Sequence, residues 1–471
     1  MRRAVPAVAA ACLLAASTVL AFFSGGFYAE SRVLAAIVLW LLVLLVAITA
    51  PAPLPRGRAG RAAVGALAFL AGWSAFSLTW APLGGPAADS AQRLVLYLGA
   101  MLLAVGVLRT RRSRLAVEPA LAAGATVVIG YGLAGRLLPG IVELARSQSA
   151  GGRLEQPITY WNGEGALAAI GLILCARLAG DRRRPPALRT LAAAAAVPLG
   201  AGVYLSYSRG AIAVAVLGLV TLVAVAPSRS QLRAAAIALA AGAAAAAIAA
   251  AFPGVAGLEG SQRSRDGAIV LALLLLLAAG AALLTTRDHK PDAGLPWAPR
   301  PGPAIAALVA AAAVALVVGG LSERPTRAEL SAGAGAARLT TVSSNRYEYW
   351  RVGLEAVADQ PLNGLGAGGF RVFWLQERAI PEVVRDVHSL ELELAAELGL
   401  VGLIALVVLV AGVVLAARRS LAHDRAMAAG WCAALLAWFL HASIDWDWQL
   451  PAVTLPAVVL AGALLALAEP P

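Results

Sequence analysis

Charge is scarce in this sequence, and lysine is almost missing from it. Of the 471 residues only 14% are charged and 60% are hydrophobic, and Lys290 is the one lysine. Soluble globular chains carry about a quarter of their residues charged, so this composition excludes an ordinary soluble protein. Long apolar runs satisfy their backbone hydrogen bonds inside a bilayer by forming helices. The sequence therefore predicts an all-α fold, a polytopic bundle of transmembrane helices.

Cysteine is also rare, and the cysteines present are far apart. Cys12, Cys175 and Cys432 each lie in an apolar run without metal-ligand spacing, which disfavours a disulfide or a zinc site. The net charge of +12 does not indicate a nucleic-acid partner, because the arginines fall mainly between the apolar runs. We expect membrane lipids as neighbours, no nucleic acid, no metal and no cofactor.

The apolar runs predict about fourteen spans, each near the roughly 20 residues that a bilayer requires. The borders within 191–226 and around 426–441 are poorly marked, so the expected range is about twelve to fourteen. The first run follows Met-Arg-Arg, and a cleaved signal peptide is an alternative for it. The predicted limits are 5–23, 33–50, 62–78, 92–108, 115–138, 161–178, 191–206, 210–226, 233–251, 267–284, 303–321, 398–417, 426–441 and 450–467.

The distribution of arginine predicts which connections face the cytoplasm. With the N-terminus inside, arginine-rich connections alternate with connections that have almost none, such as 79–90. This orientation predicts a multi-pass protein of the cytoplasmic membrane whose large loop, 322–397, lies on the outer face. The predicted order along the chain is N-terminal membrane helices at 1–140, central membrane helices at 141–321, the extracytoplasmic loop at 322–397 and C-terminal membrane helices at 398–471.

Four polar patches, far apart in the sequence, share that predicted outer face. The first is the SYSRG corner, where Arg209 stands at the junction of two apolar runs. An arginine at that depth is expensive unless it meets an anion, and its guanidinium fork suits phosphate oxygens. The alternative is an arginine that snorkels to the membrane interface. The second patch holds Arg153 and Asn162 around Tyr160 and Trp161, which form either an aromatic belt or a belt with added hydrogen-bond donors.

The third patch runs from Arg346 to Leu403. Residues 345–358 have apolar positions at helical spacing, which predicts an amphipathic helix along the membrane surface. Gly364, Gly366 and Gly369 spell GxGxxG, but no strand precedes them, so we exclude a nucleotide site and expect a structural bend.

His388 stands between this bend and the next apolar run. A neutral imidazole can act as a general base near neutral pH, and Glu391, three residues on, could orient it on a helix. The alternative is a structural loop histidine. The fourth patch begins at His441 and includes Asp445 and Asp447 as DxD, a metal motif in soluble sugar-nucleotide enzymes. Between two tryptophans, an interfacial turn with a His–Asp contact is the favoured interpretation.

Together these stretches resemble the bacterial O-antigen ligase and polymerase family of polytopic GT-C-type membrane glycosyltransferases. The resemblance covers about 150–465. It rests on three motifs: a span-edge SRG (Ser208, Arg209, Gly210), an R…W…DxPLxGxGxGxF run (Arg346, Trp350, Asp359 to Phe370) and an HSxxxxxxAExGxxG run (His388, Ser389, Ala396, Glu397, Gly399, Gly402). The family often has asparagine where this chain has Ser389.

The resemblance implies an enzyme of cell-envelope polysaccharide biosynthesis. Its donor would be a glycan on undecaprenyl diphosphate, and its acceptor a hydroxyl group of a glycan, a lipid or a protein. By the same resemblance Arg209 and Arg346 would hold the diphosphate, and His388 would activate the acceptor hydroxyl with inversion at the anomeric carbon. Arg153 is a further substrate-binding candidate, and Glu391, Asn162, His441 and Asp445 are supporting candidates. Guanidinium groups can neutralise a leaving diphosphate, so the chemistry requires no metal.

Three alternatives remain open at this stage. A polymerase of the same family would use the same chemistry as a ligase. A transporter or flippase of lipid-linked saccharides should have ionisable residues in mid-span and an internal repeat, and the sequence shows neither convincingly. A structural membrane subunit would not need arginines and a histidine together on one face.

Overall fold

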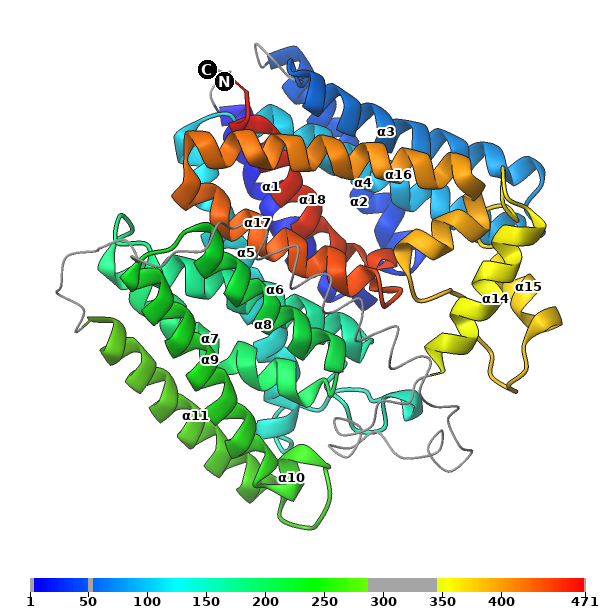
Figure 1. Ribbon diagram of the computed structural model, residues 1–471. Coiled ribbons are helices and arrows are strands. Elements are labelled where there is room, and N and C mark those ends of the chain that lie inside the picture. The colour runs from blue at the N-terminus through cyan, green and yellow to red at the C-terminus, as the bar shows by residue number, and fades with distance from the viewer. Residues whose placement is uncertain (1–3, 50–53, 287–344, 470–471) are drawn as a thin grey trace. The chain divides into compact units, whose positions relative to one another are not determined.

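The computed structural model describes residues 4–49, 54–286 and 345–469, and within these ranges the regular structure is helical (Figure 1). Nine of the described helices are long and apolar enough to cross a membrane. Three shorter apolar helices, α1, α8 and α18, add to them. The predicted all-α, polytopic fold is therefore confirmed for the described part of the chain.

The α-helices are α1 (Ala4–Ala21), α2 (Ala29–Thr49), α3 (Arg58–Phe76), α4 (Gly84–Val107), α5 (Arg111–Leu137), α6 (Trp161–Gly180), α7 (Pro186–Leu205), α8 (Arg209–Val225), α9 (Arg229–Ala250), α10 (Pro253–Ala256), α11 (Arg263–Thr286), α14 (Arg346–Asp359), α15 (Phe370–Glu377), α16 (Leu390–His423), α17 (Arg425–Ala442) and α18 (Pro451–Leu467). Short 3₁₀ turns are η1 (Ser24–Gly26), η2 (Ser77–Thr79), η3 (Gln148–Ala150) and η5 (Asp447–Gln449).

Each predicted span falls on one of these helices except 303–321, which lies outside the described residues together with 322–344 of the predicted loop. The poorly marked stretch 191–226 is two helices, α7 and α8, which are separated by a turn at 206–208. The count of fourteen spans and the orientation of the loop remain predictions.

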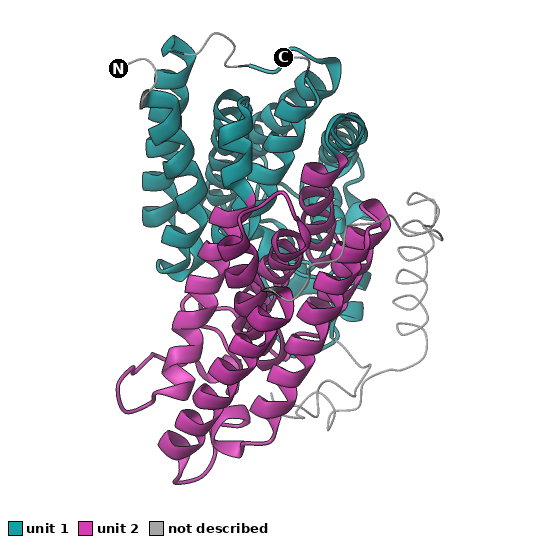
Figure 2. Ribbon diagram, turned by 90° about the vertical axis from the view of Figure 1, so that its left-hand side faces the viewer, with its two compact units in different colours: residues 1–117, 344–424, 442–471 teal, residues 118–343, 425–441 magenta. Residues whose placement is uncertain are grey.

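The described helices form two compact units (Figure 2). Unit 1 comprises 1–117, 344–424 and 442–471, and therefore holds α1 to α4, α14 to α16 and α18. Unit 2 comprises 118–343 and 425–441, and holds α6 to α11, most of α5 and almost all of α17. Each unit thus joins segments that the linear order 1–140, 141–321, 322–397 and 398–471 keeps apart.

Small residues set the helix spacing in unit 1. A Cβ atom at Gly462 of α18 would lie 2.4 Å from the Ala104 side chain of α4. A Cβ atom at Gly412 of α16 would lie 2.9 Å from the Ala63 side chain of α3. Such close backbone approach is typical of helix packing in membranes, where small residues take the place of a hydrophobic driving force.

Helix α16 is broken near its start. Gly399 has φ +67° and ψ −169°, and the Leu400 N–H donates to the Pro361 carbonyl at 2.9 Å instead of continuing the helix. A Cβ atom at Gly399 would lie 2.1 Å from the Leu362 carbonyl oxygen, so only glycine fits. The break separates a short N-terminal segment, which carries the predicted site motif, from the apolar run predicted at 398–417.

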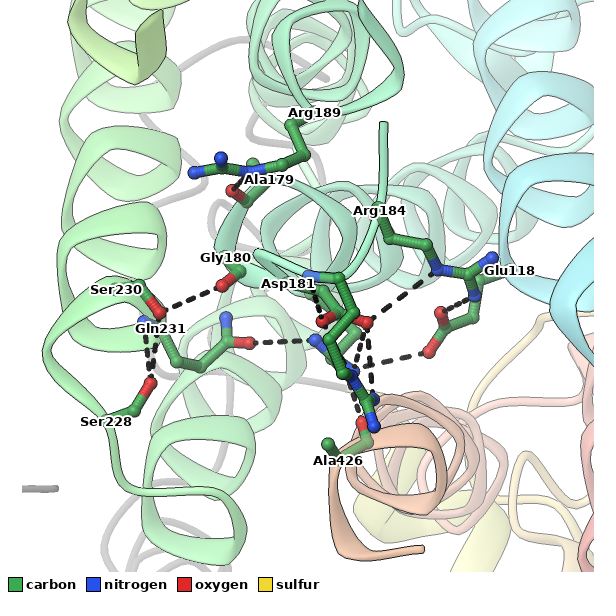
Figure 3. A network of polar contacts seen from close by, with 12 residues as sticks. Glu118, Ala179, Gly180, Asp181, Arg184, Arg189, Ser228, Ser230, Gln231 and Ala426 are labelled. Atoms are coloured by element: carbon green, nitrogen blue, oxygen red, sulfur yellow. Dashed lines mark hydrogen bonds and ion pairs between the residues drawn. The ribbon is translucent and has the colours of Figure 1, made fainter. Parts of the chain in front are cut away.

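Unit 2 has a buried ionic network at the C-terminal end of α6 (Figure 3). Arg177 pairs with Asp181 at 2.9 Å, and Arg184 pairs with Glu118 of α5 at 2.8 Å. The Arg177 Nε also donates to the carbonyl of Ala426 in α17 at 2.6 Å. Glu118 is fully buried and the other charged partners are less than 10% exposed. The network ties α5, α6 and α17 together within this unit.

Candidate functional site

In unit 1, an arginine–carboxylate pair joins the start of α14 to the loop that precedes α18. Arg346, the first residue of α14, forms an ion pair with Asp445. The Asp445 side chain is only 1% exposed, and its Oδ1 accepts the Trp446 N–H at 2.9 Å. The Arg346 side chain is 23% exposed. The pair therefore joins a partly exposed arginine side chain to a buried carboxylate.

His388 lies beside this pair in a constrained backbone conformation. Its φ of +61° is in the left-handed region, which a non-glycine residue adopts only where the surroundings hold it there. Its Nδ1 lies 2.9 Å from the carbonyl oxygen of Asp386. A carbonyl can only accept, so the hydrogen is on Nδ1 and the lone pair is on Nε2. The imidazole has the tautomer that a general base needs.

The charge state of His388 follows from its surroundings. Burial lowers the pKa of the imidazole, the Asp445 carboxylate raises it, and the Arg346 guanidinium lowers it again, with a net lowering from the ordinary value. A free imidazole titrates at about 6.5, so His388 is neutral at pH 7. The half-buried ring packs on the ring of Tyr349 with centroids 4.9 Å apart.

Glu391 is held by hydroxyl groups. The Ser443 Oγ donates to Glu391 at 2.7 Å, and the Ser389 Oγ donates to it at 3.3 Å. Ser389 also caps α16, since its side chain accepts the Leu392 N–H. The orienting contact to His388 that the sequence suggests for Glu391 is made by the Asp386 carbonyl instead. Glu391 ties the start of α16 to the loop that carries Asp445.

Sequence reasoning missed a second support of His388. The side-chain amide of Gln449 donates to Asp386 Oδ1 at 2.7 Å and to Glu393 Oε1 at 2.5 Å. Gln449 and Glu393 are both buried. The amide therefore fixes the turn whose carbonyl selects the tautomer of His388. A glutamine placed just before an apolar run was the only available signal in the sequence.

Helix α14 packs one face into a small apolar cluster of unit 1, so it is more than a surface helix. Tyr349 and Val352 of α14 pack with Trp374 of α15 and with Val387, next to His388. The Tyr349 hydroxyl donates to Glu382 at 2.8 Å. Figure 1 shows α14 and α15 beside the N-terminal end of α16. This cluster supports the imidazole of His388 from one side, through the ring of Tyr349.

The glycine-rich turn has a structural role, since it packs against α16. Gly364, Gly366 and Gly368 all have φ between +68° and +83°, which only glycine adopts without strain. The Glu397 carboxylate accepts the N–H groups of Gly368 at 2.7 Å and Phe370 at 3.2 Å. The turn docks onto α16 through these bonds, in agreement with the structural bend expected from the sequence.

Arg209 belongs to unit 2, where it is the first residue of α8. The Ser208 hydroxyl caps this helix by accepting the Ala211 N–H at 3.2 Å. Tyr207 stands just before it with φ +47°, and its hydroxyl donates to the Ala256 carbonyl at 3.0 Å. Burial, with a smaller contribution from Tyr204, raises the pKa of Tyr207 to about 12. Arg209 is therefore placed at the positive end of a well-capped helix.

Arg153, a predicted substrate ligand, is engaged with its own loop in unit 2. Its Nε donates to Ala150 at 2.7 Å, its NH2 donates to Ser149 at 2.8 Å, and its guanidinium lies 3.6 Å from the ring centroid of Trp161. The Asn162 amide donates to the Tyr160 hydroxyl at 2.9 Å. These contacts build the loop before α6.

The predicted site residues therefore fall into two groups. His388, Arg346, Glu391 and Asp445 gather in unit 1. Arg209, Arg153, Asn162 and His441 belong to unit 2, where His441 is buried in the last turn of α17. The partner of Asp445 in unit 1 is Arg346, a pairing that sequence reasoning did not foresee.

Comparison with known protein families gives a match over the part of the chain that contains Arg346 and His388. Residues 261–407, about a third of the sequence, match the family model described as O-antigen ligase. The matched segment includes Arg346, the glycine-rich turn and His388, whereas Arg209 and Asp445 lie outside it. Among curated proteins no match is found.

Proposed function

Because residues 261–407 match the O-antigen ligase family model, we propose that this chain transfers a glycan from a polyprenyl-diphosphate donor to an acceptor hydroxyl group. The family match and the apolar helices indicate a ligase- or polymerase-type membrane glycosyltransferase. The observation that carries the finer proposal is the neutral His388, with its lone pair on Nε2, beside the Arg346–Asp445 pair.

His388 acts as the general base. Its Nε2 accepts the proton of the acceptor hydroxyl while that oxygen attacks the anomeric carbon of the donor. The bond from that carbon to the diphosphate oxygen breaks, and the diphosphate leaves with the bonding electrons. Attack from the opposite side inverts the anomeric centre. The nearby Asp445 carboxylate stabilises the imidazolium that forms.

Arg346 binds the diphosphate. Its side chain is partly exposed and pairs with the buried Asp445, and a guanidinium is well suited to bind phosphate oxygens. Arg209 is the second diphosphate ligand, and its position at the N-terminus of α8 adds the positive end of the helix dipole. Arg153 shapes its own loop, which precedes α6.

The site faces the outside of the cytoplasmic membrane. This placement is supported by the alternation of arginine-rich and arginine-poor connections along the chain. The donor's undecaprenyl chain lies in the bilayer and the acceptor is a glycan, lipid or protein hydroxyl. A polymerase would use the same base and the same diphosphate ligands, with a second lipid-linked glycan as acceptor.

The test is a transfer assay with purified protein in lipid nanodiscs and a polyprenyl-diphosphate glycan. We expect His388→Ala to lower the transfer rate by about 10²- to 10⁴-fold, the usual contribution of a general base. His423→Ala is the matched control, because His423 is exposed at the opposite end of α16 and its Nδ1 lies 2.8 Å from the Arg419 carbonyl oxygen. A wild-type rate in His388→Ala would contradict the proposal, and product length would separate ligation from polymerisation.

A further inference from the structure

We infer that the groove between α1 and α2 holds the polyprenyl chain of the lipid donor, an inference that rests on the proposed function. The groove has a volume of about 840 Å³, within the range of small-molecule sites. Its walls are mainly apolar side chains of α1 and α2, among them Ala15, Val19, Leu34 and Val38. Both helices belong to unit 1, which also carries Arg346 and His388.

One end of the groove, its mouth, lies where α1 ends and α2 begins. This mouth adjoins the loop that carries Asp445. Tyr28 lines the groove, and its ring lies 5.5 Å from that of Phe27. The Phe27 ring in turn lies 5.7 Å from the ring of Trp446. Trp446 donates its backbone N–H to Asp445, the partner of Arg346. Two aromatic contacts, one hydrogen bond and one ion pair therefore connect the groove to Arg346, the proposed diphosphate-binding residue.

The contacts around the mouth fix its position. The Ser17 hydroxyl of α1 donates to the Ala452 carbonyl of α18 at 2.7 Å. A Cβ atom at Gly26 would lie 3.1 Å from the Pro451 side chain, so the turn after α1 presses against the start of α18. Buried Arg32 donates to the Phe27 carbonyl at 2.5 Å and pairs with Asp89 of α4. The mouth and the Asp445 loop are thus parts of one packed assembly.

The polarity of the groove changes along its length. Its polar lining residues, Ser24, Tyr28, Glu30 and Ser31, lie in the η1 connection or the first turn of α2. The lining then continues along both helices as far as Cys12 on one side and Leu39 on the other. At 1.5 Å per residue this distance is about 15 Å. A groove with one polar end and an apolar interior matches a lipid whose head group stays at the mouth.

A second groove differs from the α1–α2 groove in size and polarity. The groove between α8 and α9 in unit 2 has a volume of about 350 Å³. Its lining is apolar throughout, with Val216, Leu219, Leu232 and Leu239 among the residues. It lacks the polar end that the α1–α2 groove has. This second groove therefore serves as an internal reference.

The shape and charge favour a single-chain diphosphate lipid over a phospholipid. A polyprenyl lipid has one apolar chain to place in the groove, whereas a phospholipid has two. Glu30 disfavours an anionic head group directly beside it, whereas the positive charge of Arg346 in the same unit attracts one. Polyprenyl diphosphate satisfies both conditions, because its one chain ends in the anion that Arg346 binds.

The experiment uses the full chain in lipid nanodiscs and a polyprenyl diphosphate with a photoreactive group in its isoprenoid chain. We expect the label on peptides from α1 and α2, with competition by unlabelled polyprenyl diphosphate. Ala15→Trp fills the groove and should lower this labelling by about tenfold, as overpacking of an apolar site does. Ala11→Trp is the matched control, since Ala11 is an exposed alanine of the same helix that does not line the groove.

The outcomes separate this inference from the proposed function. Label on α8 and α9, or on other helices, together with wild-type transfer would overturn the inference and leave the proposed function standing. Competition by phospholipid as strong as that by polyprenyl diphosphate would also overturn it. Absence of both labelling and transfer would overturn the proposed function and the inference with it.

Discussion

Each unit has a cluster of arginine and carboxylate side chains, and the two clusters differ in how far their arginines are exposed. In unit 2, Arg177 and Arg184 are below 10% exposed, and they share Glu118 and Asp181 as partners (Figure 3). In unit 1, Asp445 is buried but its partner Arg346 is 23% exposed. The arginines of the first cluster are buried between neighbouring helices, whereas the arginine of the second cluster remains partly exposed.

This difference separates a structural role from a binding role. A buried ion pair stabilises only where every charge is compensated, which the unit 2 network approaches through backbone and side-chain partners. A partly exposed guanidinium that is held by a buried carboxylate is preorganised for an anion. The neighbouring His388, with its lone pair on Nε2, adds a reactive group that the unit 2 network lacks among the residues described.

The largest expected effect is on the unit 2 network. Glu118→Ala leaves Arg184 and Arg177 with less compensation in a fully buried position, and should lower the free energy of unfolding by about 3–5 kcal/mol. Thermal unfolding in nanodiscs measures this loss. Transfer per folded molecule should stay unchanged. Glu259→Ala, at an exposed carboxylate of the same unit, is the control. A stable variant without activity would reverse the assignment of roles.

The next effect concerns Arg346. Arg346→Ala removes a diphosphate donor and should lower transfer by about 10²- to 10³-fold, the usual contribution of one charge-stabilising donor. Arg346→Lys should recover only part of the rate, since an ammonium lacks the planar fork. The kcat and KM for the lipid donor are the measurements. Full activity in Arg346→Ala would place the diphosphate elsewhere.

The pH profile tests the neighbourhood of His388. Burial lowers the pKa of this imidazole below its ordinary value of about 6.5, and the neutral form is the active base. The rate should therefore be flat above pH 6.5 and fall, by up to tenfold per pH unit, only below the lowered pKa. Asp445→Asn removes the charge that raises this pKa, so it should move the acid limb further down. An acid limb centred above pH 6.5 would contradict this assignment.

The smallest effect is expected on the exposed side of α14. Arg351 is 41% exposed and pairs with Glu348 at 2.7 Å and Glu355 at 2.5 Å. Arg351→Ala should lower stability by at most about 1 kcal/mol, as is usual for surface ion pairs, with transfer nearly unchanged. It is the matched control for Arg346→Ala on the same helix. A loss of transfer as large as in Arg346→Ala would show that α14 acts as a whole.

The sequence predicted most helices because apolar length alone specifies a membrane helix. It also predicted His388 and Arg346 as site residues and the glycine-rich turn as a bend, since these depend on local motifs. The partner of Asp445 could not be predicted, because Arg346 lies 99 positions away in the chain. Gln449 was missed for the same reason: its partners, Asp386 and Glu393, lie 63 and 56 positions away.

The sequence by itself determined the all-α membrane fold and the kinds of side chain available for chemistry, because hydropathy and local motifs are properties of neighbouring residues. Only the tertiary structure decided which arginine stays partly open, which carboxylate supports it and which nitrogen of His388 holds the lone pair. These properties depend on burial and on contacts between distant segments, which exist only after the helices pack.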